Sequence, residues 1–297
     1  MFSIIIPLYN KADYIAETLK SVLNQTYCDY EVIVVNDSST DNSLEVASSF
    51  QDERIHIYTK ENEGVSAARN YGIMHAKYDY IAFLDADDIW ESDYLECQKK
   101  LIGTYPDAGI YSTAFYSLEK GKRKLRNVLI NEHIHFLVHD YFKESVMNGL
   151  SICWTSSLCL KKEVIKEIPM FRVGIKRGED LDLWLRIALN YDVAYLNLPK
   201  VFYRTGLSDS LTSDYSKNGE FPYYEWFNFT SESSYYRKYV ILVVYIHAKN
   251  AFIHHDYDTC LAELWSVKTI AWRFKWAERL LLLVISWIVS SQKLAHN

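Results

Sequence analysis

The sequence is poor in cysteine and has no Cys-x-x-Cys pair; its five cysteines are Cys28, Cys97, Cys153, Cys159 and Cys260. An odd number of scattered thiols fits reduced core residues better than a disulfide framework. No signal peptide is expected either, because the sequence enters an apolar run at Phe2 with no basic segment and no cleavage pattern. We therefore expect the chemistry to take place in the cytosol.

An excess of basic residues is absent too. The net charge is −6, whereas proteins that bind nucleic acid usually carry a basic excess or patch, so no nucleic-acid partner is expected. The sequence lacks the glycine-rich strings of dinucleotide oxidoreductases and P-loop kinases, and the Gly-x-Ser-x-Gly string of α/β-hydrolases. A chain of 297 residues with 49% hydrophobic composition can nevertheless bury a large core. A globular enzyme acting on a small molecule or a glycan is the simplest interpretation.

Strand and helix patterns alternate through residues 1–113. Short β-branched runs predict the strands, and apolar residues at three- and four-residue spacing predict the helices between them. The expected strands are 3–8, 31–35, 55–58, 80–84 and 109–113, and the expected helices are 15–26, a short one led by Asp41, 65–76 and 94–101. This alternation predicts an α/β fold with a mostly parallel central sheet, in which ligands bind outside the carboxyl ends of the strands.

The rest of the chain is less regular. Residues 119–126 hold five basic side chains and predict a solvated hairpin tip, with an acidic or phosphate-bearing partner as the alternative. Residues 159–168 predict a strand followed by a helix, and residues 181–189 and 239–251 predict one helix each.

A long helix is expected from Glu263 to Ser290. Its apolar run from Leu280 to Val289 is short of the ~20 residues that cross a bilayer. The helix is expected either in the core or in the plane of a membrane surface, where it would be anchored by Lys268, Trp272, Lys275, Trp276 and Arg279.

Two carboxylates, Asp85 and Asp87, follow the apolar run 80–84. Side chains two apart on an extended chain point the same way, so both would face one spot at the sheet edge. They would repel each other unless a cation lay between them. Hard oxygen ligands with open positions suit Mg²⁺ or Mn²⁺ carrying a substrate diphosphate. The pattern therefore predicts a divalent-metal site, and an ordinary acidic turn is the alternative.

Other polar residues follow the second and third strands. Asp37 could bind a base or a ribose, whereas Thr40 and Asp41 fit caps of the next helix. Gly64, at a helix N-terminus, allows the backbone to approach an anionic group closely. Arg69, one turn further on, could reach the same diphosphate or the Asp85 cluster; close packing of the helix on the sheet is the alternative.

A second acidic pair, Glu179 and Asp180, opens a later helix. The fold could bring one of these carboxylates opposite Asp85, where it would deprotonate an incoming hydroxyl. The alternative is that both interact with the helix macrodipole. The remaining candidates are His133, His135, His139 and the pair His254-His255. Their spacing suits metal ligands, but no strong third ligand accompanies them, so we assign no metal site there.

Together these strings resemble the family 2 glycosyltransferases of the GT-A fold, which are inverting enzymes that build bacterial surface polysaccharides. The resemblance runs through SIIIPLYN (3–10), VVNDSSTDNS (34–43), NEGVSAARNYGI (62–73), FLDADDIW (83–90) and GEDLDLWLRIA (178–188). It implies a GT-A catalytic domain over residues 1–215, made of a nucleotide-sugar half (1–113) and an acceptor half (114–215). A helical extension over residues 216–297 would follow it.

The resemblance also implies roles for single residues. Tyr9 and Asp37 would contact the nucleobase and ribose, Asp87 would ligate the metal, and Asp180 would be the general base. Asp85 would bond the ribose side, and Arg69 would lie near the nucleotide. The implied donor-binding set is Pro7, Tyr9, Asp37, Asn62, Gly64, Arg69, Asp85 and Ala86, and the implied metal ligands are Asp87 and Asp85.

Two departures from the family pattern stand out. Asn36 occupies the place of a second Asp, and Gly206 stands where a His often follows the Tyr-Arg pair at 203–204, which leaves a metal or phosphate contact there open. The Gln-x-x-Arg-Trp string of processive synthases is absent, so the resemblance implies transfer of a single sugar. The donor would be a nucleotide-diphosphate sugar such as a UDP-hexose, and the acceptor a glycan or a lipid-linked hydroxyl reached through peripheral membrane contact of the C-terminal helix.

Two other functions stay open. A sugar nucleotidyltransferase also needs a carboxylate pair and a metal at a sheet edge, but it would normally carry a basic, glycine-rich loop where residues 7–10 stand here. A degenerate glycan-binding protein is the other alternative, although the four acids Asp37, Asp85, Asp87 and Asp180 are all present.

Overall fold

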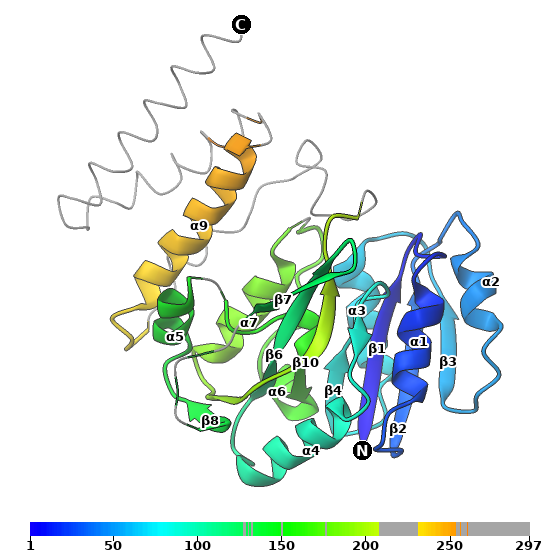
Figure 1. Ribbon diagram of the computed structural model, residues 1–297, viewed down its shortest axis with the longest axis horizontal. Coiled ribbons are helices and arrows are strands. Elements are labelled where there is room, and N and C mark those ends of the chain that lie inside the picture. Colours follow the sequence, from blue (N-terminus) through cyan, green and yellow to red (C-terminus); the bar gives the residue numbers. More distant parts are fainter. Residues whose placement is uncertain are drawn as a thin grey trace, which may run out of the picture.

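The computed structural model describes residues 1–126, 129, 131, 133–149, 151–175, 177–207, 231–253, 256 and 260. Within these ranges a ten-stranded sheet lies between helices (Figure 1). The strand order is β3-β2-β1-β4-β9-β6-β10-β5, with β7 beside β6 and β8 beside β10. The strands are β1 (Phe2–Leu8), β2 (Tyr30–Asn36), β3 (Ile55–Thr59), β4 (Tyr80–Phe83), β5 (Ile89–Trp90), β6 (Ile110–Glu119), β7 (Lys122–Arg126), β8 (His135–Val138), β9 (Leu158–Lys161) and β10 (Val193–Arg204).

The first four strands are parallel, as the sequence predicts, with β1 between β2 and β4 and with β3 outside β2. Beyond β4 the sheet is mixed, because β9 is antiparallel to both β4 and β6. The segment before β9 already lies at the carboxyl edge, where the hydroxyl of Ser156 accepts a hydrogen bond from Asp85 N. Because β9 starts at this edge, it runs in the opposite direction to β4 and β6.

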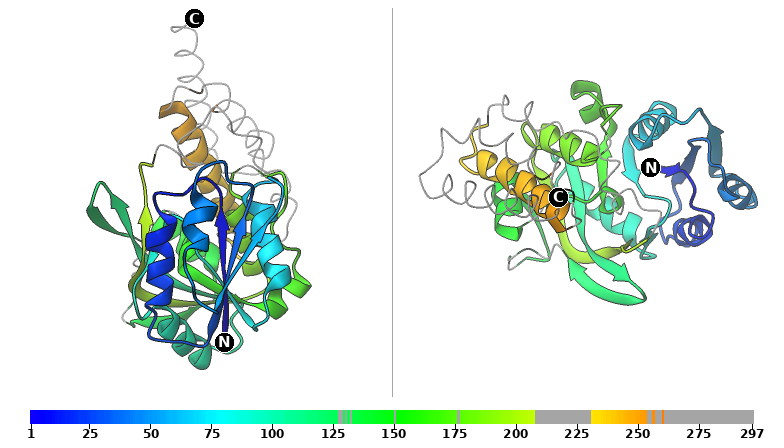
Figure 2. Two further views of the ribbon diagram at one scale, coloured as in Figure 1. Left: turned by 90° about the vertical axis from the view of Figure 1, so that its right-hand side faces the viewer. Right: turned by 90° about the horizontal axis from the view of Figure 1, so that it is seen from above.

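Helices cover both faces of the sheet (Figure 2). Alternate side chains of β1 point to opposite faces, so Ile5 packs with Ala68 of α3 while Ile4 packs with Leu19 of α1. Burial on both faces explains the continuous apolar runs of these strands. The helices are α1 (Ile15–Leu23), α2 (Ser43–Ser48), α3 (Val65–His75), α4 (Tyr94–Thr104), α5 (Tyr141–Asn148), α6 (Lys162–Glu167), α7 (Glu179–Ala188) and α9 (Tyr236–Ile253), and a 3₁₀ turn, η1, spans Thr155–Ser157.

A glycine sets the distance between α3 and β1. A Cβ atom at Gly72 would lie 2.5 Å from Cγ2 of Ile5, so only glycine lets the helix approach the strand this closely. Arg69, one turn earlier on the same helix, is thereby held at the edge of the sheet.

The boundaries expected for α3, α4, α6, α7 and α9 are confirmed to within a few residues. The hairpin expected at residues 119–126 is also confirmed, with a tight turn at Lys120 and Gly121, whose φ angles are 47° and 76°. β10 was not predicted. Its pattern is interrupted by Pro199 and by two register shifts against β6, which hide the period of two that marks a strand.

The C-terminal prediction can be followed as far as α9. This helix packs against α5 (Figure 1). It contributes Tyr239 and Val243 to the same core as Trp184 of α7. The aromatic segment 221–229, the pair His254-His255 and the long helix expected from Glu263 to Ser290 lie outside the described residues, so the membrane-surface helix stays a prediction. In the described ranges, none of the helices combines the length and hydropathy needed to span a bilayer.

Candidate active site

The acids that follow β4 lie in a turn and not on an extended strand. β4 ends at Phe83, and Asp88 N donates a hydrogen bond to Asp85 O at 3.0 Å. The expectation that Asp85 and Asp87 lie on an extended chain is therefore wrong. The tertiary structure instead supplies each acid with its own basic neighbour.

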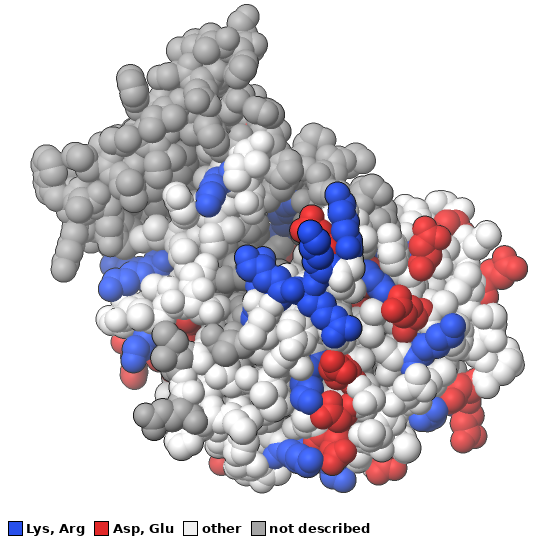
Figure 3. Space-filling model, in the orientation of Figure 1, with Lys and Arg blue, Asp and Glu red and all other residues white. Residues whose placement is uncertain are grey.

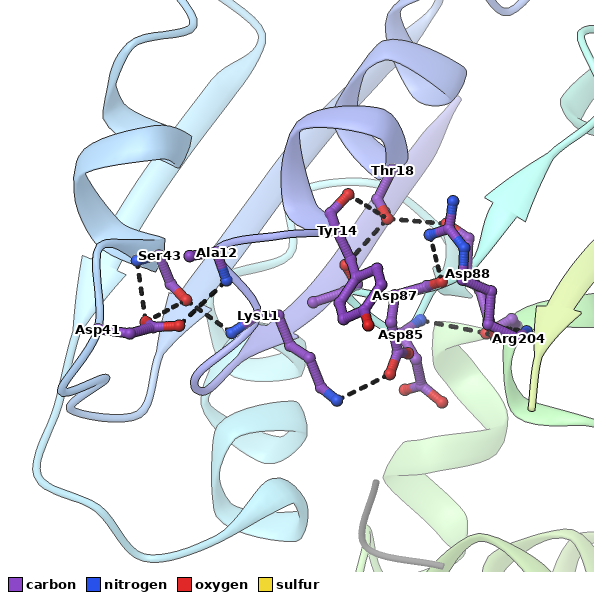
Figure 4. Close-up of polar contacts among 12 residues, drawn as sticks. Lys11, Ala12, Tyr14, Thr18, Asp41, Ser43, Asp85, Asp87, Asp88 and Arg204 are labelled. Atoms are coloured by element: carbon purple, nitrogen blue, oxygen red, sulfur yellow. Dashed lines mark hydrogen bonds and ion pairs between the residues drawn. The ribbon is translucent and has the colours of Figure 1, made fainter. Parts of the chain in front are cut away.

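Asp87 is paired with Lys11, from the loop after β1. Lys11 Nζ lies 3.0 Å from Asp87 Oδ2 (Figure 4). The Asp87 side chain is 17% exposed. Burial raises the pKa of Asp87, the charge of Lys11 opposes this shift, and the charge of Asp85 adds to it. The carboxylate of Asp87 is thus held at the sheet edge with access to solvent.

Asp88 fastens the turn to the rest of the sheet. Its buried carboxylate accepts hydrogen bonds from Ser156 Oγ at 2.5 Å and from Arg204 N at 3.0 Å. The guanidinium of Arg204 also donates to Asp87 O at 2.7 Å (Figure 4). Burial raises the pKa of Asp88 well above its usual range, and the charges of Asp87 and Asp85 raise it further. Asp88 therefore has a structural role beside the two more accessible acids.

Arg69 links the two halves of the site. Its guanidinium donates to Asp85 Oδ1 and to Glu179 Oε1, both at 2.7 Å, although Glu179 is 110 residues away in sequence. The side chain is buried and lies over the ring of Phe171, with 5.3 Å between the guanidinium carbon and the ring centroid. One buried arginine thus holds the acidic turn after β4 next to the N-terminus of α7.

Glu179 and Asp180 occupy different environments. Glu179 is bound to Arg69, and burial followed by the charge of Asp180 raises the pKa of Glu179 to about 7. Asp180 accepts hydrogen bonds from Thr155 Oγ1 at 2.9 Å and from Leu181 N at 2.7 Å. Burial raises the pKa of Asp180, while the charge of Arg69 opposes the shift. Of the two acids, Asp180 is the one that does not bond to Arg69.

Asp37 organises the end of β2, where the sequence predicts nucleotide contacts. Its buried carboxylate accepts hydrogen bonds from Lys60 Nζ at 3.0 Å, Glu63 N at 3.1 Å and Gly64 N at 2.8 Å. These bonds fasten the loop before α3 to the end of β2. The N–H of Gly64, expected to face an anionic ligand, is directed at Asp37 instead.

The remaining predicted donor-binding residues lie at or near the same edge. Tyr9 follows β1 with 46% of its surface exposed, and Asn62 is exposed in the loop before α3. Pro7 is half-buried in β1, and Ala86 is buried between the two acids, where its carbonyl accepts a hydrogen bond from Thr18. Among the described residues, neither Tyr9 nor Asn62 bonds to the acids after β4.

The weaker candidates have structural partners. The N-cap residue of α2 is Asn42 and not Thr40 or Asp41. Asp41, one residue earlier, accepts a hydrogen bond from Ser43 N at 2.9 Å, and Thr40 N donates to Asn10 Oδ1. His139 lies 2.8 Å from Asp192. In the part of the chain that the structure describes, His, Cys, Asp and Glu side chains form no group of three or more placed to hold a metal.

Sequence reasoning missed the segment Ser151–Ser157, which supports three of the acids. Thr155 donates to Asp180, and Ser156 both donates to Asp88 and accepts from Asp85 N. Hydroxyl residues in a short turn carry no recognisable pattern, so only their tertiary contacts mark them. Lys11 was also missed, because only its tertiary contact with Asp87 marks it.

We expect Ser156→Ala to lower the free energy of unfolding by about 1–3 kcal/mol, because a donor to the buried carboxylate of Asp88 is lost. It should also weaken Mn²⁺ binding in the presence of UDP, because the turn that carries Asp85 and Asp87 is loosened. Ser157→Ala is the matched control, since the Ser157 hydroxyl bonds to Trp154 O and not to an acid. Thermal unfolding and calorimetric titration measure both effects, and normal Mn²⁺ affinity in Ser156→Ala would contradict the positioning role.

Comparison with known proteins decides the family. Residues 3–168, more than half of the chain, match the family model described as Glycosyl transferase family 2. The chain belongs to glycosyl transferase family 2. The matched span contains Asp37, Arg69 and the acidic turn, while Glu179 and Asp180 lie just beyond it.

Several glycosyltransferases are about one third identical to this chain over the residues that align. An uncharacterized glycosyltransferase of Rickettsia felis is 36% identical over 191 residues, which are 63% of this chain and 30% of that protein. The putative teichuronic acid biosynthesis glycosyltransferase TuaG of Bacillus subtilis is 32% identical over 198 residues, covering 66% of this chain and 75% of TuaG. The chain thus spans less than a third of one relative and three quarters of another.

Solved structures confirm the glycosyltransferase fold. S. aureus TarS 1-349 in complex with UDP has a TM-score of 0.60 at 20% identity, covering 69% of this chain and 60% of TarS. The complex of the same fragment with UDP-GlcNAc has a TM-score of 0.63 at 17% identity, covering 96% of this chain and 79% of the TarS fragment. The α/β architecture with a central sheet flanked by helices is therefore that of a glycosyltransferase domain.

Proposed function

We propose that this family 2 protein transfers a single sugar from a nucleotide-diphosphate sugar, a UDP-hexose, to a hydroxyl group of a glycan or a lipid-linked acceptor, with inversion at the anomeric carbon. The observation that carries the proposal is the double contact of Arg69 with Asp85 and Glu179, both at 2.7 Å. It joins the acids expected at the donor to the helix end that carries Asp180. A sugar bound between them would have a leaving group on one side and a base on the other.

The donor set fits a divalent cation. Asp85 and Asp87 supply carboxylate oxygens, and 27% and 17% of their side chains are exposed. Mg²⁺ and similar hard ions are commonly held by one or two carboxylates together with substrate phosphates, and not by a full protein cage. Asp87, with Asp85 beside it, would hold Mn²⁺ or Mg²⁺, and the ion would neutralise charge on the departing nucleoside diphosphate.

The protein's own residues account for the other requirements. Asp180 would accept the proton of the acceptor hydroxyl at its carboxylate as that oxygen bonds to the anomeric carbon and the bond to the diphosphate breaks. Thr155 orients this carboxylate through its hydrogen bond to Asp180 Oδ2. Arg69 stabilises the negative charge of Asp85 and Glu179 in the buried region between the two substrates. Inversion follows from a base and a leaving group on opposite sides of the sugar.

Relatives support the class of substrate. TuaG is named for teichuronic acid biosynthesis, and the TarS structures contain UDP or UDP-GlcNAc. These ligands belong to those proteins, and together with the acids described above they favour a uridine-diphosphate donor and a surface-polysaccharide acceptor.

The proposal is tested by a donor screen. We expect UDP and one or more UDP-hexoses to raise the melting temperature when Mn²⁺ is present, because ligands that bind only the folded state stabilise it. The same donor should be hydrolysed slowly to UDP. GDP and TDP sugars serve as controls for the identity of the nucleobase. Absence of both protection and hydrolysis with every UDP-sugar, with and without Mn²⁺, would contradict the proposed function.

A further inference from the structure

The β6–β7 hairpin carries a concentration of positive charge on a chain whose net charge is −6. Its basic residues are Lys120, Lys122, Arg123, Lys124 and Arg126, all exposed. Figure 3 shows lysine and arginine side chains gathered over this hairpin. Among the described residues, none of these five forms an ion pair with a carboxylate, unlike Lys11, Lys60 and Arg69 in the site.

The side chains of the hairpin divide between two faces. Successive residues of a strand point to opposite sides, so Lys122, Lys124 and Arg126 share one face, with successive charges roughly 7 Å apart. Arg123 lies on the other face, over the ring of Phe202 at 4.7 Å. Arg126 is held in place by a hydrogen bond from its Nε to Ser117 Oγ at 3.2 Å. The face carries one acid, Glu119, which is in register with Lys122.

The three-cation face leads into the candidate active site. Lys124 is in register with Ser117 of β6, and Ser117 is in register with Tyr203 of β10, so the three side chains lie in one row across the sheet. Neighbouring strands are ~4.8 Å apart, which places the Lys124 backbone about 10 Å from that of Tyr203.

Aromatic rings continue this row towards Asp180, the proposed general base. Phe115, in register with Arg126, packs on Trp154 with ring centroids 5.3 Å apart, and Trp154 packs on Tyr203 at 4.7 Å. Trp154 directly precedes Thr155, the residue that donates to Asp180. The basic face and Asp180 thus lie at the two ends of one packed aromatic row, in which Phe115 is buried and Trp154 and Tyr203 are half-buried.

We propose that the face formed by Lys122, Lys124 and Arg126 binds an anionic acceptor chain and that the half-buried rings of Trp154 and Tyr203 lead its end to Asp180. This inference rests on the proposed function and names the acceptor class as a polymer bearing phosphate or carboxylate groups. A regular row of three cations beside a single acid, with no ion pair among the described residues, matches repeated anionic groups along an extended polymer. The Arg126 guanidinium can bind either group through two hydrogen bonds. A solvated hairpin would not need its charges aligned with the site.

The test compares two double variants with equal loss of charge. Lys122→Gln/Lys124→Gln removes two cations of the face, and Lys20→Gln/Lys166→Gln removes two exposed lysines from α1 and α6. Binding is measured by calorimetry with linear inorganic polyphosphate, polygalacturonate and neutral dextran, and by sedimentation with phosphatidylglycerol vesicles. Melting temperature with UDP and Mn²⁺ is measured in parallel for donor binding.

We expect the hairpin variant to bind at least one of the two anionic polymers about tenfold more weakly than wild type does. The slope of log affinity against log salt should fall by roughly 1 for each lysine removed. The control variant should bind like wild type, dextran should not bind, and UDP protection should be unchanged in both variants. Loss with polyphosphate alone would assign phosphate as the anionic group, and loss with polygalacturonate alone would assign carboxylate.

Equal polymer binding by the two double variants would overturn the inference and leave the proposed function intact. Hairpin-dependent binding to vesicles but to neither polymer would also overturn it, in favour of a membrane surface. Failure of the proposed function has a different signature, which is the absence of UDP protection and donor hydrolysis in the wild-type protein.

Discussion

Asp180→Asn should lower kcat by about 10² to 10⁴-fold while donor affinity stays unchanged, because asparagine keeps the shape of the side chain but cannot take up the proton of the acceptor. Stability should not fall. Burial raises the pKa of Asp180 above that of the unfolded chain, so the charged carboxylate costs stability at pH values above the unfolded pKa, including pH 7. Removing that charge should leave the melting temperature equal or higher. Steady-state kinetics and thermal unfolding of the purified variant check both parts.

The pH profile distinguishes Asp180 from its neighbour. A base must be deprotonated to act, so kcat/KM of the wild type should fall as the pH drops through the raised pKa of Asp180. This limb should vanish in Asp180→Asn and persist in Glu179→Gln. Since the pKa of Glu179 is raised to about 7, a limb near pH 7 that disappears only in Glu179→Gln would transfer the role of base to Glu179. Asp182 is not an alternative, because its fully buried carboxylate is bound to Arg186.

Asp87→Ala should abolish metal-dependent donor binding and lower kcat/KM by about 10³-fold or more, since a coordinated cation at a departing diphosphate supplies several kcal/mol. The measurement is titration of Mn²⁺ in the presence of UDP, followed by turnover with the donor found in the screen. Excess EDTA should reduce wild-type turnover to a similar level.

Asp13→Ala is the matched control for this change. Asp13 is an exposed carboxylate in the loop between β1 and α1, next in sequence to the segment that carries Lys11. Its removal changes the net charge equally but should leave Mn²⁺ affinity and turnover unaltered. Full turnover by Asp87→Ala, or by the wild type in EDTA, would rule out the metal assignment.

The parts of the site that depend on local pattern were predictable. β-branched runs mark β1 and β2, and an apolar run marks β4. A polar residue after such a run must lie at the carboxyl edge of a parallel sheet, which places Asp37 and Asp85 correctly. The placement of Asp85 relative to Asp87 was not predictable, because the chain turns after Phe83 and the strand period no longer applies.

Local pattern also misjudged the sheet beyond β4. A short apolar run such as β9 has no direction of its own, and its antiparallel pairing follows from where the preceding segment crosses the sheet edge. Pro199 and the register shifts of β10 removed the alternation that would have marked the strand joining Tyr203 to the site.

Hydrophobic periodicity and the residues at strand ends thus determined the α/β class, the first four strands, the hairpin and the carboxyl edge that holds the acids. Tertiary structure alone decided which groups meet there: Arg69 with Glu179, Lys11 with Asp87, and Ser156 with Asp88. The reason is physical, because periodicity records how each residue is buried along its own element, whereas an ion pair or hydrogen bond requires two groups within about 3 Å. Contacts between residues as far apart in sequence as Arg69 and Glu179 arise only when the sheet and helices are packed together.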